Sequence, residues 1–70
     1  MAIVKVIELL AQSGTSWEDA AQVALREASK TIDNIQSIYV KEMQAVVENN
    51  QITQYRLNVK ISFVIDENRR

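Results

Sequence analysis

The clearest pattern in the chain is the alternation of apolar and polar residues between positions 52 and 65. Such a two-residue period is typical of a β-strand with one buried and one exposed face. The apolar set is Tyr55, Leu57, Val59, Ile61, Phe63 and Ile65, and the polar set is Gln54, Arg56, Asn58, Lys60 and Ser62. A second β-branched run occupies positions 37–48, and the polar residues 49–51 separate the two runs. The pattern therefore predicts a long antiparallel hairpin.

A different period, with apolar residues three or four positions apart, runs from Thr15 to Asp33 and predicts a helix. Its apolar residues are Trp17, Ala20, Ala21, Ala24, Leu25, Ala28 and Ile32. Thr15 and Glu18 fit a capping box at the start, and the helix is expected to end near Asp33 and Asn34. Because the inward side is mostly alanine, the helix can lie close to a curved sheet.

The N-terminal residues 2–11 are rich in isoleucine, valine and leucine and predict a first strand, which residues 12–14 end at the chain's single glycine. The expected order is β-α-β-β. The predicted fold class is therefore α+β, with a three-stranded antiparallel sheet curved around one helix. Residues 1–70 are expected to form a single domain, because no change of composition divides them.

The absence of cysteine and histidine from the sequence removes several kinds of chemistry. Without cysteine there is no disulfide framework or thiolate metal site, and without histidine the usual neutral-pH general base is missing. Ser37 has no histidine to activate it as a nucleophile. The sequence therefore favours a protein that is not an enzyme.

Net charge and chain length limit the kinds of partner that this protein can bind. The net charge is −1 and the basic residues are dispersed, which argues against nucleic-acid binding. Lys5 and Glu8 interrupt the N-terminal apolar run, so it predicts neither a signal peptide nor a membrane span, and we expect a cytoplasmic protein. A 70-residue domain without disulfide or metal is marginal alone, and the sequence therefore favours a homo-oligomer.

One helix can cover only one face of such a sheet, and the residues predicted for the other face are polar. They are Tyr39, Lys41, Arg56, Asn58, Lys60 and Ser62. This face could form a hydrogen-bonded interface between subunits, line a small-molecule site where subunits meet, or simply face water. Arg56 could pair with Glu42 or Glu48 between subunits, or bind an anion. For Trp17 the helical pattern favours an anchoring role over a ligand platform.

Three segments together resemble the dodecins, small β-α-β-β proteins known as flavin-binding homododecamers that form hollow shells. The segments are KVIELL at 5–10, the SW-x-x-AA-x-x-AL-x-x-A-x-x-TI-x-NI pattern at 16–35, and Y-x-L-x-V-x-I-S-F at 55–63. The similarity spans nearly the whole chain. It implies a homododecamer with ligand sites between subunits.

At two positions this sequence differs from the flavin-binding dodecins. Those proteins stack the flavin on a tryptophan that opens the second strand, where this chain has Ser37, and they hydrogen-bond it through a glutamine where this chain has Arg56. A Gly-Thr-Ser after the first strand is usual in those proteins, whereas this chain has Ala11-Gln12-Ser13 before its own Gly14-Thr15-Ser16. These changes, with Thr-Ser-Trp-Glu at 15–18, look more like a subgroup of dodecins described as calcium-binding.

The resemblance thus implies a shell that sequesters a small ligand, with Ser37, Tyr39 and Arg56 as the cofactor-binding residues. The implied ligand is FMN, riboflavin, FAD or a related anionic molecule, bound more weakly than usual. The alternative is a non-flavin shell that binds calcium or another cation, or is structural. The densest oxygen clusters are residues 33–34 and 66–67, and a calcium site could assemble at a symmetry axis.

Overall fold

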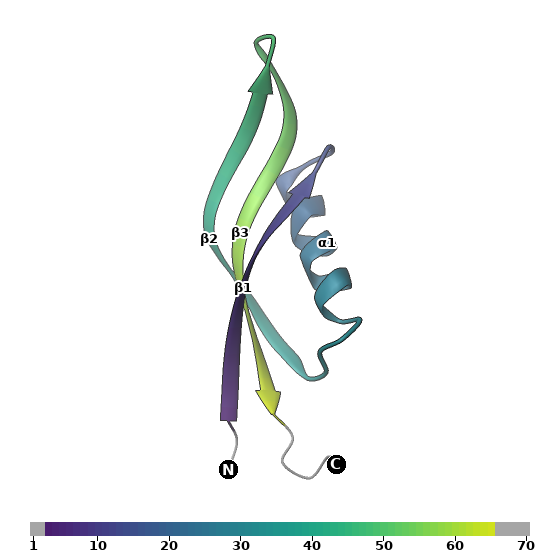
Figure 1. The fold of residues 1–70 in the computed structure, drawn as a ribbon, viewed down its shortest axis with the longest axis vertical. Helices are drawn as coiled ribbons and strands as arrows, with labels where there is room; N and C mark the ends of the chain where they lie inside the picture. The colour runs from purple at the N-terminus through teal and green to yellow at the C-terminus, as the bar shows by residue number, and fades with distance from the viewer. Residues whose placement is uncertain (1–2, 66–70) are drawn as a thin grey trace.

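The computed structural model describes residues 3–65, which form three strands and one helix. The elements are β1 (Ile3–Ser13), α1 (Trp17–Ala28), β2 (Ile35–Glu48) and β3 (Gln51–Ile65). Both edge strands pair antiparallel with β3, so that the strand order is β1-β3-β2 (Figure 1). The predicted β-α-β-β fold is confirmed. The turn expected at 12–14 comes slightly later, because β1 continues to Ser13.

The hairpin of β2 and β3 turns through only two residues. Asn49 and Asn50 have φ values of 53° and 63°, and Gln51 already belongs to β3. Positive φ at both central positions is the geometry of a type I′ turn, whose twist matches that of the flanking strands. The predicted turn at 49–51 is therefore one residue too long, because asparagine adopts the left-handed conformation readily.

The helix begins one residue later than predicted. Ser16 is the N-cap, and its hydroxyl accepts a hydrogen bond from the backbone N–H of Asp19 at 3.0 Å. The predicted Thr15–Glu18 capping box was wrong. The Thr15 amide instead donates to Ser13 Oγ at 2.9 Å, and the Ser13 hydroxyl donates to the Asp19 carboxylate at 2.7 Å. The end of β1 is thereby tied to the first turn of α1.

The helix also ends earlier than predicted, at Ala28 rather than near Asp33. Ile32 donates its backbone N–H to the Ala28 carbonyl at 3.0 Å, but the chain between them forms a turn. Asn34 then adopts a left-handed conformation with φ of 64°, which redirects the chain into β2. Ile32 still contacts the core from this turn.

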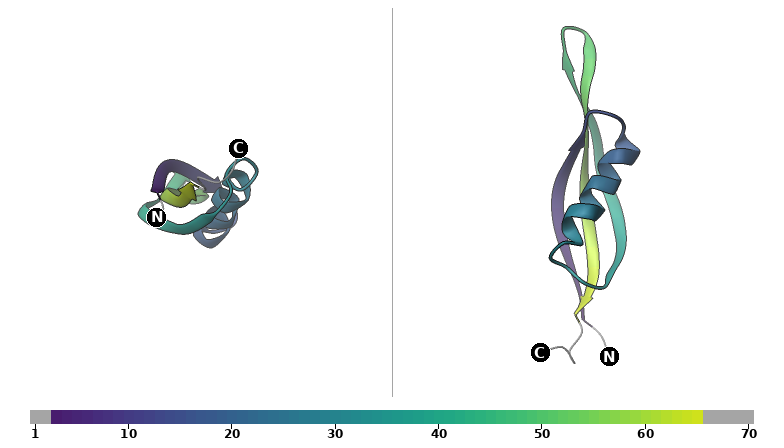
Figure 2. Two further views of the ribbon diagram at one scale, coloured as in Figure 1. Left: turned by 90° about the horizontal axis from the view of Figure 1, so that it is seen from below. Right: turned by 90° about the vertical axis from the view of Figure 1, so that its right-hand side faces the viewer.

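The hydrophobic core lies between α1 and the sheet, chiefly under β1 and β3 (Figure 2). The three buried helix residues are all alanines, which lets the helix approach the sheet closely, as predicted. Leu25 was expected to face the core but is 38% exposed. The fully buried large side chains are Val59 and Ile61 of the central strand. No helix within residues 3–65 is long and apolar enough to cross a membrane.

Candidate functional site

The sheet face away from the helix carries the sequence-predicted site residues. We call it the open face, and its polar residues follow from strand alternation and register. They are Glu8 and Gln12 of β1, Arg56, Asn58, Lys60 and Ser62 of β3, and Ser37, Tyr39, Glu42 and Gln44 of β2. The alternation predicted for β3 is confirmed, since Leu57, Val59 and Ile61 are buried on the opposite side.

Arg56 lies at the centre of a polar row that crosses all three strands. Gln12 of β1 and Gln44 of β2 are its register partners on either side. Its Nε donates to Gln12 Oε1 at 2.7 Å. Neither ion pair found among residues 3–65 includes Arg56, so Glu42 and Glu48 do not neutralise it within one chain. The terminal N–H groups of the planar guanidinium are therefore available for an anion such as phosphate or carboxylate.

Ser37 and Tyr39 lie further along the open face. Ser37 is opposite Ser62, and the two hydroxyls are 2.5 Å apart. Tyr39 is opposite Lys60 and is 64% exposed. Counted along β3, these register positions are six and four residues from Arg56, or roughly 20 Å and 13 Å. Within one chain the predicted residues thus share a face without forming one pocket.

Between these two groups lies a charged cluster with an unsatisfied acceptor. Lys41 Nζ is 3.4 Å from the Glu8 carboxylate, so this ion pair links the two edge strands. Asn58 Oδ1 is buried without a hydrogen-bond partner.

The sequence did not identify Gln12 and Gln44 as neighbours of Arg56. Continuing the alternation of β1 to Ser13 would have found Gln12, whereas Gln44 depends on the register of β2.

The open face is also less polar than predicted, because β1 was left out of that expectation. The outward residues Val4, Val6 and Leu10 are 58%, 57% and 55% exposed. Apolar side chains this exposed on one strand are typical of a surface that interacts with another molecule.

Trp17 lies on the helix side of the sheet, where it links α1 to β2. Its Nε1 donates to the Gln44 carbonyl at 2.9 Å, and its ring contacts Tyr55 edge to face with centroids 4.9 Å apart. These contacts agree with the anchoring role favoured by the sequence. They leave Ser37 without an aromatic platform supplied by Trp17.

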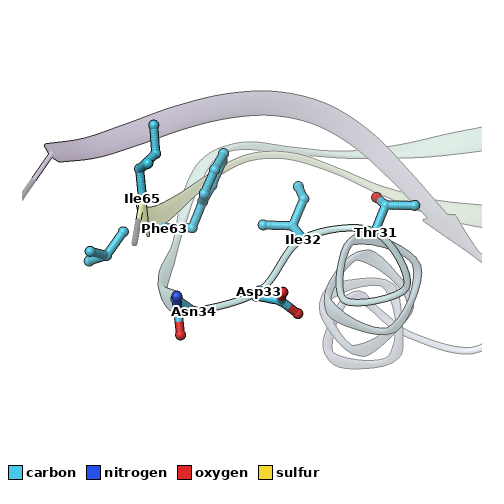
Figure 3. A pocket seen from close by; sticks show the side chains of 7 residues that line it. Thr31, Ile32, Asp33, Asn34, Phe63 and Ile65 are labelled. Atoms are coloured by element: carbon cyan, nitrogen blue, oxygen red, sulfur yellow. The ribbon is translucent and has the colours of Figure 1, made fainter. Parts of the chain in front are cut away.

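The oxygen cluster at Asp33 and Asn34 borders a hollow of about 250 Å³. Figure 3 shows its wall formed by Phe63 and Ile65 of β3, with the Asp33 carboxylate pointing away from the Phe63 ring. No group of three acidic side chains that could hold a metal occurs within residues 3–65. The other predicted cluster, residues 66–67, lies outside the described residues.

These features define the class of protein: a small α+β domain whose sheet has one exposed face, with an arginine at the centre of that face that no carboxylate pairs with within residues 3–65. The family model described as Dodecin matches residues 3–66, and the chain belongs to the dodecin family. The resemblance drawn from the sequence is thereby confirmed.

Individual relatives agree with this assignment. Calcium dodecin of Mycobacterium tuberculosis is 35% identical over 63 residues, covering 90% of this chain and 89% of that protein. Its crystal structure, described as having a novel calcium-binding site, has a TM-score of 0.80 at 32% identity and covers 97% of both chains. A single-residue variant of Thermus thermophilus dodecin has a TM-score of 0.91 at 27% identity, covering 96% of this chain and all of that one.

Proposed function

We propose that this protein is the non-catalytic subunit of a dodecin-like homododecameric shell in the cytoplasm. It sequesters a small anionic ligand, a flavin or a related molecule, where the open faces of neighbouring copies meet. The observation that carries the proposal is Arg56, a cation that no carboxylate neutralises within residues 3–65 and that two glutamines flank in register.

Self-assembly is supported by the small core and by the apolar residues left on the surface. Within residues 3–65, Leu57, Val59 and Ile61 are the only buried hydrophobic residues apart from alanines. Exposed large residues are found on every strand, among them Val6, Met43 and Ile52. Both edge strands also present backbone groups that another chain can approach. A second copy would bring Ser37, Tyr39 and Arg56 of different chains within reach of one ligand.

The residues fit the phosphate of a flavin nucleotide better than its ring. Ser37 offers a hydroxyl and little stacking area, which forfeits about 1–3 kcal/mol relative to an aromatic platform. A charge-assisted hydrogen bond from Arg56 contributes about 1.5–3 kcal/mol. FMN, which carries a phosphate, should therefore bind more tightly than riboflavin, which does not.

Fluorescence titration with FMN and riboflavin tests this assignment. In Arg56→Met the FMN affinity should fall about tenfold to a hundredfold, towards that of riboflavin, because one charged hydrogen bond is lost. Lys30→Met, the same loss of charge in the turn that follows the helix, should leave FMN binding unchanged. Equal affinities for the two flavins, unaffected by Arg56→Met, would exclude the anion site.

Ser37→Trp tests the position of the ring. If Ser37 is the vacated stacking position, both flavins should gain roughly one to two orders of magnitude in affinity. Ser37→Ala is the matched control, because it changes the side chain without adding stacking area. Unchanged affinity for both flavins in Ser37→Trp would contradict the placement of the ligand.

A calcium-binding shell is the second candidate, supported by the 35% identity to calcium dodecin. Since no acidic cluster of three exists within residues 3–65, the ion would need carboxylates from several copies. Calcium should then raise the melting temperature of the ligand-free assembly, and magnesium at the same concentration should not. Native mass spectrometry of the freshly purified protein reports the subunit number together with any retained flavin or calcium.

A further inference from the structure

Part of the sheet on the helix side has no cover within the chain. Helix α1 lies chiefly over β1 and β3 and reaches little of β2. Three β2 residues are consequently exposed, with Val40 at 41%, Met43 at 58% and Val47 at 60%. Ile52, the register partner of Val47 on β3, is 50% exposed. Together these residues form an apolar strip that runs to the hairpin end.

A β-bulge keeps this strip on one side of the sheet. Val40 is opposite Val59 and Met43 is opposite Leu57, so three steps on β2 match two steps on β3. Without the bulge near Lys41, strict alternation would place Val40 and Met43 on opposite faces. The irregularity therefore gathers apolar side chains where no element of the same chain covers them.

At one end of the strip lies an apolar hollow of about 260 Å³. It is lined by Trp17, Glu18, Ala21, Val40, Met43 and Leu57. An apolar cavity of roughly 150 Å³ is enough to hold a benzene ring. The hollow between the helix start and β2 can therefore take aliphatic side chains of another molecule.

At the other end, the hairpin projects beyond the rest of the sheet. The pairing of β1 stops where Ser13 meets Tyr55, so the hairpin end, residues 46–54, has no third strand beside it (Figures 1 and 2). The Val47–Ile52 pair lies in this part. Met43 and Val47 are four residues apart on one strand, or about 13 Å. The hairpin end of a chain therefore cannot fold back into its own hollow.

We propose that the Val47–Ile52 hairpin end of one copy docks into the Trp17–Met43 hollow of a second copy. The proposal rests on the self-assembly in the proposed function and names the surfaces that meet. Every chain carries one projecting hairpin end and one hollow, and both are apolar. In an assembly of identical chains, each hollow can therefore receive the hairpin end of one other chain. Because the two patches are different parts of the chain, the contact is heterologous and can close into a ring.

Disulfide cross-linking tests this contact cleanly because the native chain has no cysteine. The variant carries Met43→Cys and Val47→Cys together. At about 13 Å these two positions are too far apart to bridge within one chain, since a disulfide requires Cα atoms within roughly 7 Å. Oxidation should therefore give covalent multimers on a non-reducing gel, while each single variant stays a single chain.

Gln22→Cys with Ser29→Cys is the control. Both residues are exposed on the side of α1 opposite its buried alanines, and seven residues of helix place them about 10 Å apart, too far to bridge within one chain. The control pair should not form multimers. Circular dichroism and native mass spectrometry of every variant establish that the fold and the assembly are retained.

An intact assembly in which the Met43–Val47 pair gives only single chains would overturn the docking contact and leave the proposed function standing. Cross-linking by either single variant would indicate a two-fold contact and would overturn the heterologous one. Equal cross-linking of the control pair would also reject it. A native protein that stays monomeric would overturn both the docking contact and the proposed shell.

Discussion

Replacing Trp17 by phenylalanine should destabilise the protein, because the indole links the helix to the edge strand β2. The variant loses the hydrogen bond from Nε1 to the Gln44 carbonyl, which contributes about 0.5–1.5 kcal/mol. The edge-to-face contact with Tyr55 is worth about 0.5–1.5 kcal/mol, and a smaller ring keeps part of it. The expected loss in the free energy of unfolding is therefore about 1–2 kcal/mol.

Against the total stability of a 70-residue chain this loss is large. At about 0.05–0.15 kcal/mol per residue, the whole domain is stable by roughly 4–10 kcal/mol. Urea unfolding followed by far-UV circular dichroism measures the change. Tryptophan fluorescence cannot be used, because the variant lacks the only tryptophan of the sequence. All proteins must be compared at one protomer concentration, because assembly adds to the apparent stability.

Lys30→Met is the control, because Lys30 is exposed in the turn after the helix and its loss should change stability by less than about 0.5 kcal/mol. FMN affinity distinguishes the two roles weighed for Trp17. An anchor predicts a lower urea midpoint in Trp17→Phe with little change in FMN binding. An unchanged midpoint, or a large loss of FMN binding at full stability, would refute the anchoring role.

Two further predictions concern the core and the hairpin turn. Ile61→Ala empties a position of the central strand that is 0% exposed, and unfolding measurements should show a loss of about 2–5 kcal/mol; a loss below that of Ile61→Val would contradict the assigned core. Asn50→Gly should keep or raise the melting temperature, because residue 50 has φ of 63° and glycine suits the second position of a type I′ turn. Asn50→Val should lower it, and equal stability of both variants would argue against this turn geometry.

Local patterns predicted the order of strands and helix, because each element shows the spacing of apolar residues typical of its type. Alternation in β3 located the buried residues Leu57, Val59 and Ile61, and the alanine spacing located the buried side of α1. Boundaries were less predictable. Ser16 and Thr15 are both good capping residues, and the choice depends on Ser13, whose hydroxyl is already bonded to Asp19.

Alternation in the sequence also placed Arg56 and Tyr39 on one sheet face, and the family resemblance added Ser37 to the site. The sequence could not tell how far apart they lie. That depends on the register between β2 and β3, including the bulges, which no local period encodes. Gln12 and Gln44 were missed as neighbours of Arg56 for the same reason.

By itself, then, the sequence determined the β-α-β-β order, the lean helix and the family, because these follow from the period and identity of residues close along the chain. Only the tertiary structure decided that α1 leaves much of β2 uncovered, that the hairpin projects past β1, and that Trp17 donates to Gln44. Those features arise from contacts between residues far apart in sequence, where strand order and register set which side chains meet.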